Sequence, residues 1–112
     1  MGLNDFAVSV TEQPERAVVC VCGDLDYETC PQLLRVVDML VLPDRILVLD
    51  LARVTFIGTC ALHVLLALRA RAIEEEWTLD LAGAPEQAQH VFDLTATRHL
   101  FTLIPALAPA RP

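Results

Sequence analysis

Three side chains with reactive groups lie close together near the middle of the chain. Thr59, Cys60 and His63 provide a hydroxyl, a thiol and an imidazole where an apolar segment gives way to an expected helix. Thr59 is expected at the N-cap of this helix, where a side-chain oxygen can accept a hydrogen bond from a free backbone N–H. A phosphate on the same hydroxyl would meet the positive end of the helix dipole. Thr59 is therefore interpreted either as a phosphorylation site or as a structural helix cap.

Cys60 and His63 also suggest a small thiol-dependent enzyme, with Cys60 as the nucleophile and His63 as the base. Positions three apart on a helix lie near each other, which satisfies part of the geometry that such a pair needs. A third group must orient the base, and the sequence places no acid for that role. Asp50 ends an apolar run and is expected to bond loop N–H groups. We therefore expect no catalytic residues and interpret the cysteines as small buried hydrophobes.

The composition indicates one small acidic domain that binds a protein. The chain has 112 residues, of which 54% are hydrophobic, and a formal net charge of −7. This length is enough for a single hydrophobic core. The negative charge repels nucleic acids and anionic membranes, so a protein is the expected partner.

No membrane segment, metal site or cofactor site is expected from the sequence. Residues 54–68 form the longest uncharged stretch, and they fall short of the ~18–20 apolar residues that span a bilayer. The four cysteines lack the C-x-x-C spacing of zinc sites. The start of the chain shows no basic segment followed by an apolar one. No secretory signal is therefore expected, and the expected location is cytoplasmic.

Hydrophobic periodicity predicts strands and helices in alternation after an initial hairpin. Helix signals include Thr29 before Pro31 and an apolar stripe from about Cys60. The order predicts an α/β domain (α+β in some schemes) that spans residues 1–104. Its mixed sheet has about four to five strands, with helices mainly on one side. Residues 105–112, rich in Pro and Ala, are expected to be a loosely ordered tail. The expected strands are 6–10, 17–22, 46–49, 78–81 and 101–104, and the expected helices are one that starts near Pro31 and is ended by Pro43, one over 60–75 and one over 86–94.

The segment from Asp50 to Leu62 reads DLARVTFIGTCAL. It resembles the signature of the STAS domain, the sulfate-transporter and anti-sigma-factor-antagonist family, which is approximately D-L-x-x-V-x-F-I-D-S-S-G-L. The family's phosphoacceptor, a Ser or Thr, corresponds to Thr59. Gly58 replaces the acidic residue that usually precedes it, and Ala61 replaces the small Gly before the leucine. The residues that match are Asp50, Leu51, Val54, Phe56, Ile57 and Leu62.

Two further segments are similar to motifs of the same family. Residues 23–26 look like its G-x-L-D after the second strand. Residues 94–101 are similar to its L-T-G…L-F segment, with Ala96 in place of a usual Gly. The resemblance therefore covers nearly the whole chain and implies a single STAS-like domain.

The resemblance implies an anti-sigma factor antagonist, a regulator that is not an enzyme and that binds an anti-sigma factor with serine-kinase activity. Phosphorylation of Thr59 would add about −1.5 to −2 charges to the interface and prevent docking. The expected partner-binding residues are Asp24, Asp26, Gly58, Thr59, Cys60, His63 and Ala67.

Several alternatives stay open at this point. Gly58 and Ala61 favour a STAS module that is never phosphorylated and that binds constitutively or acts as a scaffold. A STAS subunit associated with lipid transport is a further alternative. Asp24 and Asp26 are either partner-binding residues or turn residues. The small-residue stripe that contains His63 is either a docking face for a helix or a solvated surface.

Overall fold

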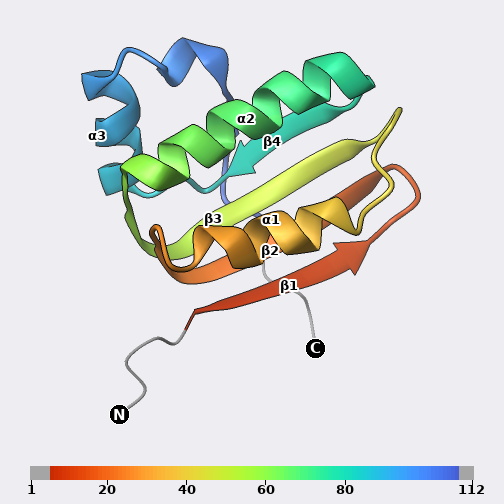
Figure 1. Ribbon diagram of the computed structural model, residues 1–112, viewed down its shortest axis with the longest axis horizontal. Coiled ribbons are helices and arrows are strands. Elements are labelled where there is room, and N and C mark those ends of the chain that lie inside the picture. The colour runs from red at the N-terminus through yellow and green to blue at the C-terminus, as the bar shows by residue number, and fades with distance from the viewer. Residues whose placement is uncertain (1–5, 109–112) are drawn as a thin grey trace.

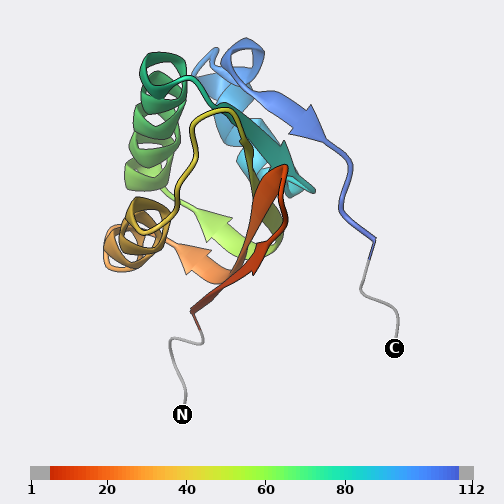
Figure 2. The same ribbon diagram turned by 90° about the vertical axis from the view of Figure 1, so that its right-hand side faces the viewer.

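The computed structural model describes residues 6–108, which form a five-stranded mixed sheet and three α-helices. The elements are β1 (Ala7–Glu12), β2 (Arg16–Leu25), α1 (Cys30–Asp38), β3 (Ile46–Ile57), α2 (Thr59–Glu75), β4 (Thr78–Ala82), α3 (Glu86–Leu94), the 3-10 helix η1 (Arg98–Leu100) and β5 (Thr102–Ile104). The strands lie in the sheet in chain order, from β1 to β5. Figure 1 labels β1 to β4, and the last strand is seen in Figure 2. β1 is antiparallel to β2, and each later pair of neighbours is parallel.

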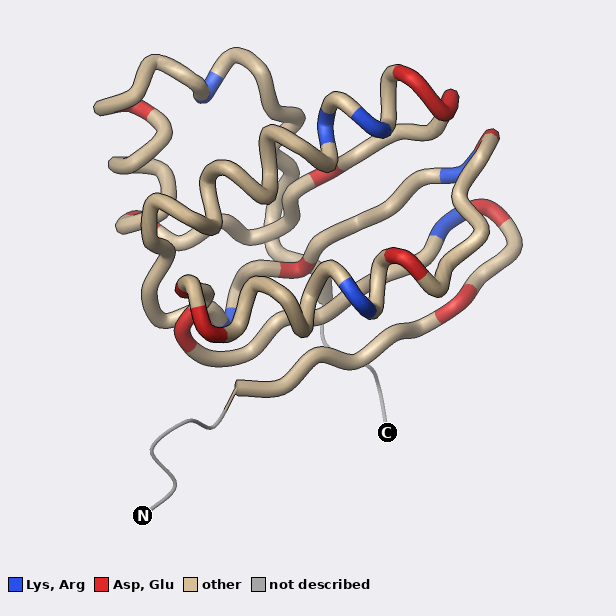
Figure 3. Tube along the Cα trace, in the orientation of Figure 1, with Lys and Arg blue, Asp and Glu red and all other residues tan. Residues whose placement is uncertain are grey.

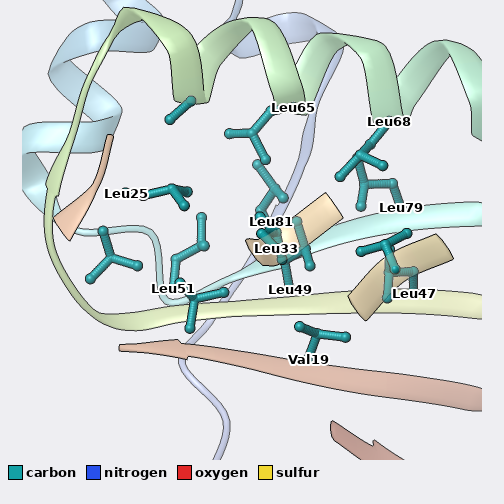
Figure 4. Packing of buried hydrophobic residues seen from close by; sticks show 14 of the residues in the cluster. Val19, Leu25, Leu33, Leu47, Leu49, Leu51, Leu65, Leu68, Leu79 and Leu81 are labelled. Carbon is teal, nitrogen blue, oxygen red and sulfur yellow. The ribbon is translucent and has the colours of Figure 1, made fainter. Parts of the chain in front are cut away.

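Helices α1 and α2 lie side by side on the same side of the sheet (Figure 1, Figure 2). The core forms where their apolar stripes meet alternate residues of the strands. Leu65 and Leu68 of α2 point toward Leu49 of β3 and Leu81 of β4, with Val19 of β2 in the same cluster (Figure 4). All five side chains are fully buried. The α/β class and the mixed sheet with helices mainly on one side are confirmed.

β3 has 12 residues and extends further than the sequence predicts. The apolar run predicts a strand over 46–49 followed by a loop, and the loop part of this prediction is wrong. β2 pairs with β3 as far as Ile57, and both Val54 and Ile57 are buried. β4 pairs with β3 only as far as Asp50. β3 therefore extends beyond the end of its pairing with β4, and Gly58 alone separates β3 from α2.

The remaining elements agree with the expected order, with small shifts at their ends. α1 stops at Asp38, because the N–H groups of Met39 and Leu40 bond carbonyls three positions back and tighten the last turn. Residues 105–108 form no helix or strand, and the rest of the expected tail, 109–112, lies outside the described residues. None of the helices within residues 6–108 has the length and apolar character needed to cross a bilayer.

Candidate functional site

Thr59 is the first residue of α2, and its side chain is exposed. The N-cap is Gly58, whose extended backbone has φ −98° and ψ −178°. The Gly58 carbonyl accepts the N–H of Leu62 at 3.2 Å, which starts the helical hydrogen bonding. The prediction that Thr59 is the N-cap is therefore wrong, because its own backbone is already helical and no side-chain bond caps the start of α2. The Thr59 hydroxyl has no capping role and lies at the positive end of the helix.

The exposed side of α2 next to Thr59 is made of small or uncharged residues. Thr59, Cys60, His63 and Ala67 are all exposed, and their spacing places them on neighbouring positions of the helix surface. The first Asp, Glu, Lys or Arg of α2 is Arg69, so the charges of the helix lie in its second half (Figure 3). The structure thus brings four of the predicted site residues together, and we call Thr59, Cys60, His63 and Ala67 the α2 face.

The two acidic residues near the end of β2 have different roles. The Asp26 carboxylate accepts the N–H of Glu28 at 2.9 Å and the N–H of Thr29 at 3.1 Å, which closes the turn before α1. The Asp24 carboxylate accepts the hydroxyl of Thr55 at 2.6 Å and joins the ends of β2 and β3. Asp26 is therefore a turn residue, whereas Asp24 is exposed and accessible to a partner.

A backbone hydrogen bond places this turn beside the start of α2. The Gly58 N–H donates to the Leu25 carbonyl at 3.1 Å. Residues 24–28, which we call the acidic turn, contain three carboxylates and include Leu25 itself (Figure 3). The acidic turn and the α2 face therefore border each other at one end of the sheet.

The thiol-enzyme alternative gains no support from the geometry. Burial raises the pKa of the Cys30 thiol to about 11, with the neighbouring Cys60 and Asp26 adding to the rise. This thiol stays protonated at neutral pH, but the nucleophile of the alternative is Cys60, which is exposed. The interpretation of the cysteines as buried hydrophobes is therefore right for Cys30 and wrong for Cys60. Within residues 6–108, the ion pairs of carboxylates are all with arginines, and His63 takes part in none of them. The structure therefore shows no acid that orients His63 as a base.

Two exposed aromatic residues border the same surface, and sequence reasoning did not predict them as site residues. Phe56 is 46% exposed and Tyr27, in the acidic turn, is 74% exposed. The Phe56 Cε2 atom lies 3.4 Å from the position that a Cβ on Gly58 would take. The placement of Tyr27 between Asp26 and Glu28 is a sequence signal for an exposed aromatic. Phe56 has no such signal, because register shifts between β2 and β3 change which residues of β3 face the core.

Gln87 of α3 contacts the end of β3 from the side opposite β2, and sequence reasoning also missed it. The Ile57 N–H donates to Gln87 Oε1 at 2.9 Å, and Gln87 Nε2 donates to the Ile57 carbonyl oxygen at 3.1 Å. The two residues are 30 positions apart, so no local pattern indicates this contact.

Comparison with known proteins assigns the chain to a family. The family model described as "Mlab, STAS domain" matches residues 8–105. The chain belongs to the STAS domain family. The resemblance seen in the central signature and in the two flanking motifs is thereby confirmed.

Solved structures of anti-sigma factor antagonists share the fold of this STAS domain. An anti-sigma factor antagonist from Mycobacterium paratuberculosis is 27% identical, with a TM-score of 0.80 over 92% of this chain and 88% of its own. The antagonist SpoIIAA in its unphosphorylated form is 14% identical, with a TM-score of 0.73 over 90% of this chain and 89% of its own. A putative antagonist from Thermotoga maritima is also 14% identical, with a TM-score of 0.74 over 87% of this chain and 85% of its own. A search of curated protein sequences finds no match to the chain.

Proposed function

We propose that this STAS domain is an anti-sigma factor antagonist that binds its partner through the α2 face and the acidic turn. The observation that carries the proposal is the Thr59 hydroxyl, which is exposed and has no capping role at the start of α2. It lies at the family's phosphoacceptor position and at the positive end of a helix dipole. The solved antagonist that is 27% identical to this chain supports the same class of regulator.

The proposed partner is an anti-sigma factor with serine-kinase activity. A kinase needs a hydroxyl that it can reach, and Thr59 satisfies this requirement. The small side chains of the α2 face allow a close approach, and the exposed rings of Phe56 and Tyr27 provide the aromatic anchors that protein interfaces favour. Asp24, which is exposed, is placed to orient a basic side chain of the partner. In this proposal the STAS domain regulates by docking and has no catalytic residue of its own.

Phosphorylation of Thr59 would act as the switch between docking and release. The unmodified α2 face loses little hydration energy when a partner covers it, because it contains no Asp, Glu, Lys or Arg. A phosphate would add about −1.5 to −2 charges beside the acidic turn, so that desolvation and like-charge repulsion both oppose docking. The test has two steps. The partner is first isolated as the protein that co-purifies with the tagged domain, and its binding to the wild type and to Thr59 variants is then measured by titration.

A second candidate function is a STAS module that docks without being phosphorylated, as a scaffold or a lipid-transport-associated subunit. The observation that favours it is Gly58, because the family signature has an acidic residue at this position. The identity of the co-purified protein separates the two candidates. A serine kinase supports the antagonist role, and a transporter ATPase supports the lipid-transport role.

Gly58→Asp is expected to stabilise the domain by about 0.3–1 kcal/mol, because Asp is a better N-cap than Gly and complements the helix dipole. The backbone accepts a side chain there, since φ is −98° and a Cβ would approach only the Phe56 ring, at 3.4 Å. Urea denaturation measures the effect. Gly58→Ala is the control, because it adds the Cβ without a cap and is expected to give no gain. At high ionic strength, where repulsion from the acidic turn is screened, a Gly58→Asp domain less stable than wild type would contradict the assignment of Gly58 as the N-cap.

A further inference from the structure

The end of β3 is held by a strand on one side and by a side chain on the other. β2 pairs with β3 as far as Leu25 opposite Ile57, whereas β4 pairs only as far as Ala82 opposite Asp50. Beyond Asp50, the described part of the chain provides no strand on the β4 side of β3. Backbone groups at such an edge need other hydrogen-bond partners where water cannot reach them.

Gln87, the second residue of α3, provides both of these partners for Ile57. Its side-chain oxygen accepts the Ile57 N–H at 2.9 Å, and its side-chain nitrogen donates to the Ile57 carbonyl at 3.1 Å. A primary amide presents an acceptor and a donor side by side, as the backbone of a neighbouring strand does. Ile57 is only 1% exposed, so loss of the amide would leave its backbone groups poorly satisfied.

The peptide group that joins Ile57 to Gly58 is also anchored in the opposite direction. The Gly58 N–H donates to the Leu25 carbonyl of β2 at 3.1 Å. Two successive residues before Thr59 are therefore fixed, one toward α3 and one toward β2. Thr59 follows directly and is the first residue of α2, so these bonds hold the two residues that immediately precede the helix.

We propose that Gln87 is a positioning residue for Thr59. Its amide fixes the backbone of Ile57 and Gly58, so that the α2 face is presented to a partner in one orientation. Gln87 acts through Ile57, and it makes α3 part of the structure on which docking depends. The consequence for docking rests on the proposed function, whereas the effect on the backbone does not.

Amide hydrogen exchange of the full chain, followed by NMR, tests the positioning role without a partner. Gln87→Met keeps the length and helix propensity of the side chain but removes both hydrogen bonds. We expect exchange of the Ile57 amide, which loses its acceptor, to become at least about fivefold faster, the equivalent of one lost hydrogen bond. Exchange of the Gly58 amide is expected to rise as well, because its own bond to the Leu25 carbonyl depends on the same backbone position. Gln89→Met is the matched control, because Gln89 lies on the same helix and its amide bonds the Ala84 carbonyl instead, at 2.9 Å.

Leu49, in the buried middle of β3, reports whether the effect is local. We expect its exchange to stay unchanged in Gln87→Met. Unchanged exchange at Ile57 would overturn the proposal. An increase at Leu49 equal to that at Ile57 would also overturn it, because it would indicate a general loss of stability.

The docking consequence is read separately, by titration of the co-purified partner. Weaker binding to Gln87→Met than to Gln89→Met supports it, and equal binding overturns it. Failure of the proposed function has a different signature, which is a partner that binds Thr59→Glu and wild type equally.

Discussion

Thr59→Glu is expected to weaken binding of the partner protein by about a hundredfold or more, because like charges or an uncompensated charge at an interface cost several kcal/mol. The substitution places a carboxylate on the α2 face, beside the three carboxylates of the acidic turn. A partner that covers this face would have to remove water from the new charge without neutralising it. Isothermal titration of the co-purified partner against both proteins measures the change.

Two controls distinguish a switch from a general effect of substitution. Thr59→Ala removes the hydroxyl without adding a charge and is expected to bind as tightly as the wild type. Ile73→Glu adds the same charge to a position of α2 that is 65% exposed, about 21 Å further along the helix and more than one turn beyond Ala67, and is also expected to bind normally. Wild-type affinity of Thr59→Glu would leave the phosphorylation switch without a mechanism.

Phe92→Ala is expected to lower the free energy of unfolding by about 3–5 kcal/mol, through lost apolar burial and the cavity that remains. Phe92 is fully buried, and its ring centroid lies 5.1 Å from that of Phe101. This contact packs α3 against the segment that leads into β5. Since α3 also carries Gln87, its packing supports the start of α2 as well as the core. Urea denaturation followed by circular dichroism measures the loss.

Leu94→Ala is the matched control for this prediction. Leu94 lies on the same helix but is 72% exposed, so its truncation is expected to change the free energy of unfolding by less than about 0.5 kcal/mol. Equal losses from the two substitutions would contradict the packing described for α3.

The order of the elements could be predicted from the sequence because each one has a local signal. The continuous apolar run of β3 and the periodic apolar stripe of α2 are examples. The end of β3 could not be predicted in this way. Its extension to Ile57 depends on pairing with β2 across two register shifts, and such pairing is a property of the assembled sheet.

The candidate site could be predicted in part, for the same reason. The helix signal and the family signature placed Thr59 at the start of α2, but an N-cap differs from a first helical residue by one position. The extended backbone of Gly58 decides between them. The sequence left Asp26 as either a turn residue or a partner-binding residue. Its bonds to two backbone N–H groups identify it as a turn residue. Gln87 had no signal, because its contact with Ile57 joins residues that are distant in the chain.

The central claim is that Thr59 is a phosphoacceptor whose modification controls docking. Phosphopeptide mass spectrometry of the protein from its native host, during growth and under stress, tests it most directly. A Thr59→Ala strain serves as the control that assigns the signal to this residue. The account predicts phosphate on Thr59 in an amount that changes between the two conditions. A Thr59 that stays unmodified in both, with its peptide fully covered, would contradict the account and favour a STAS module that docks constitutively.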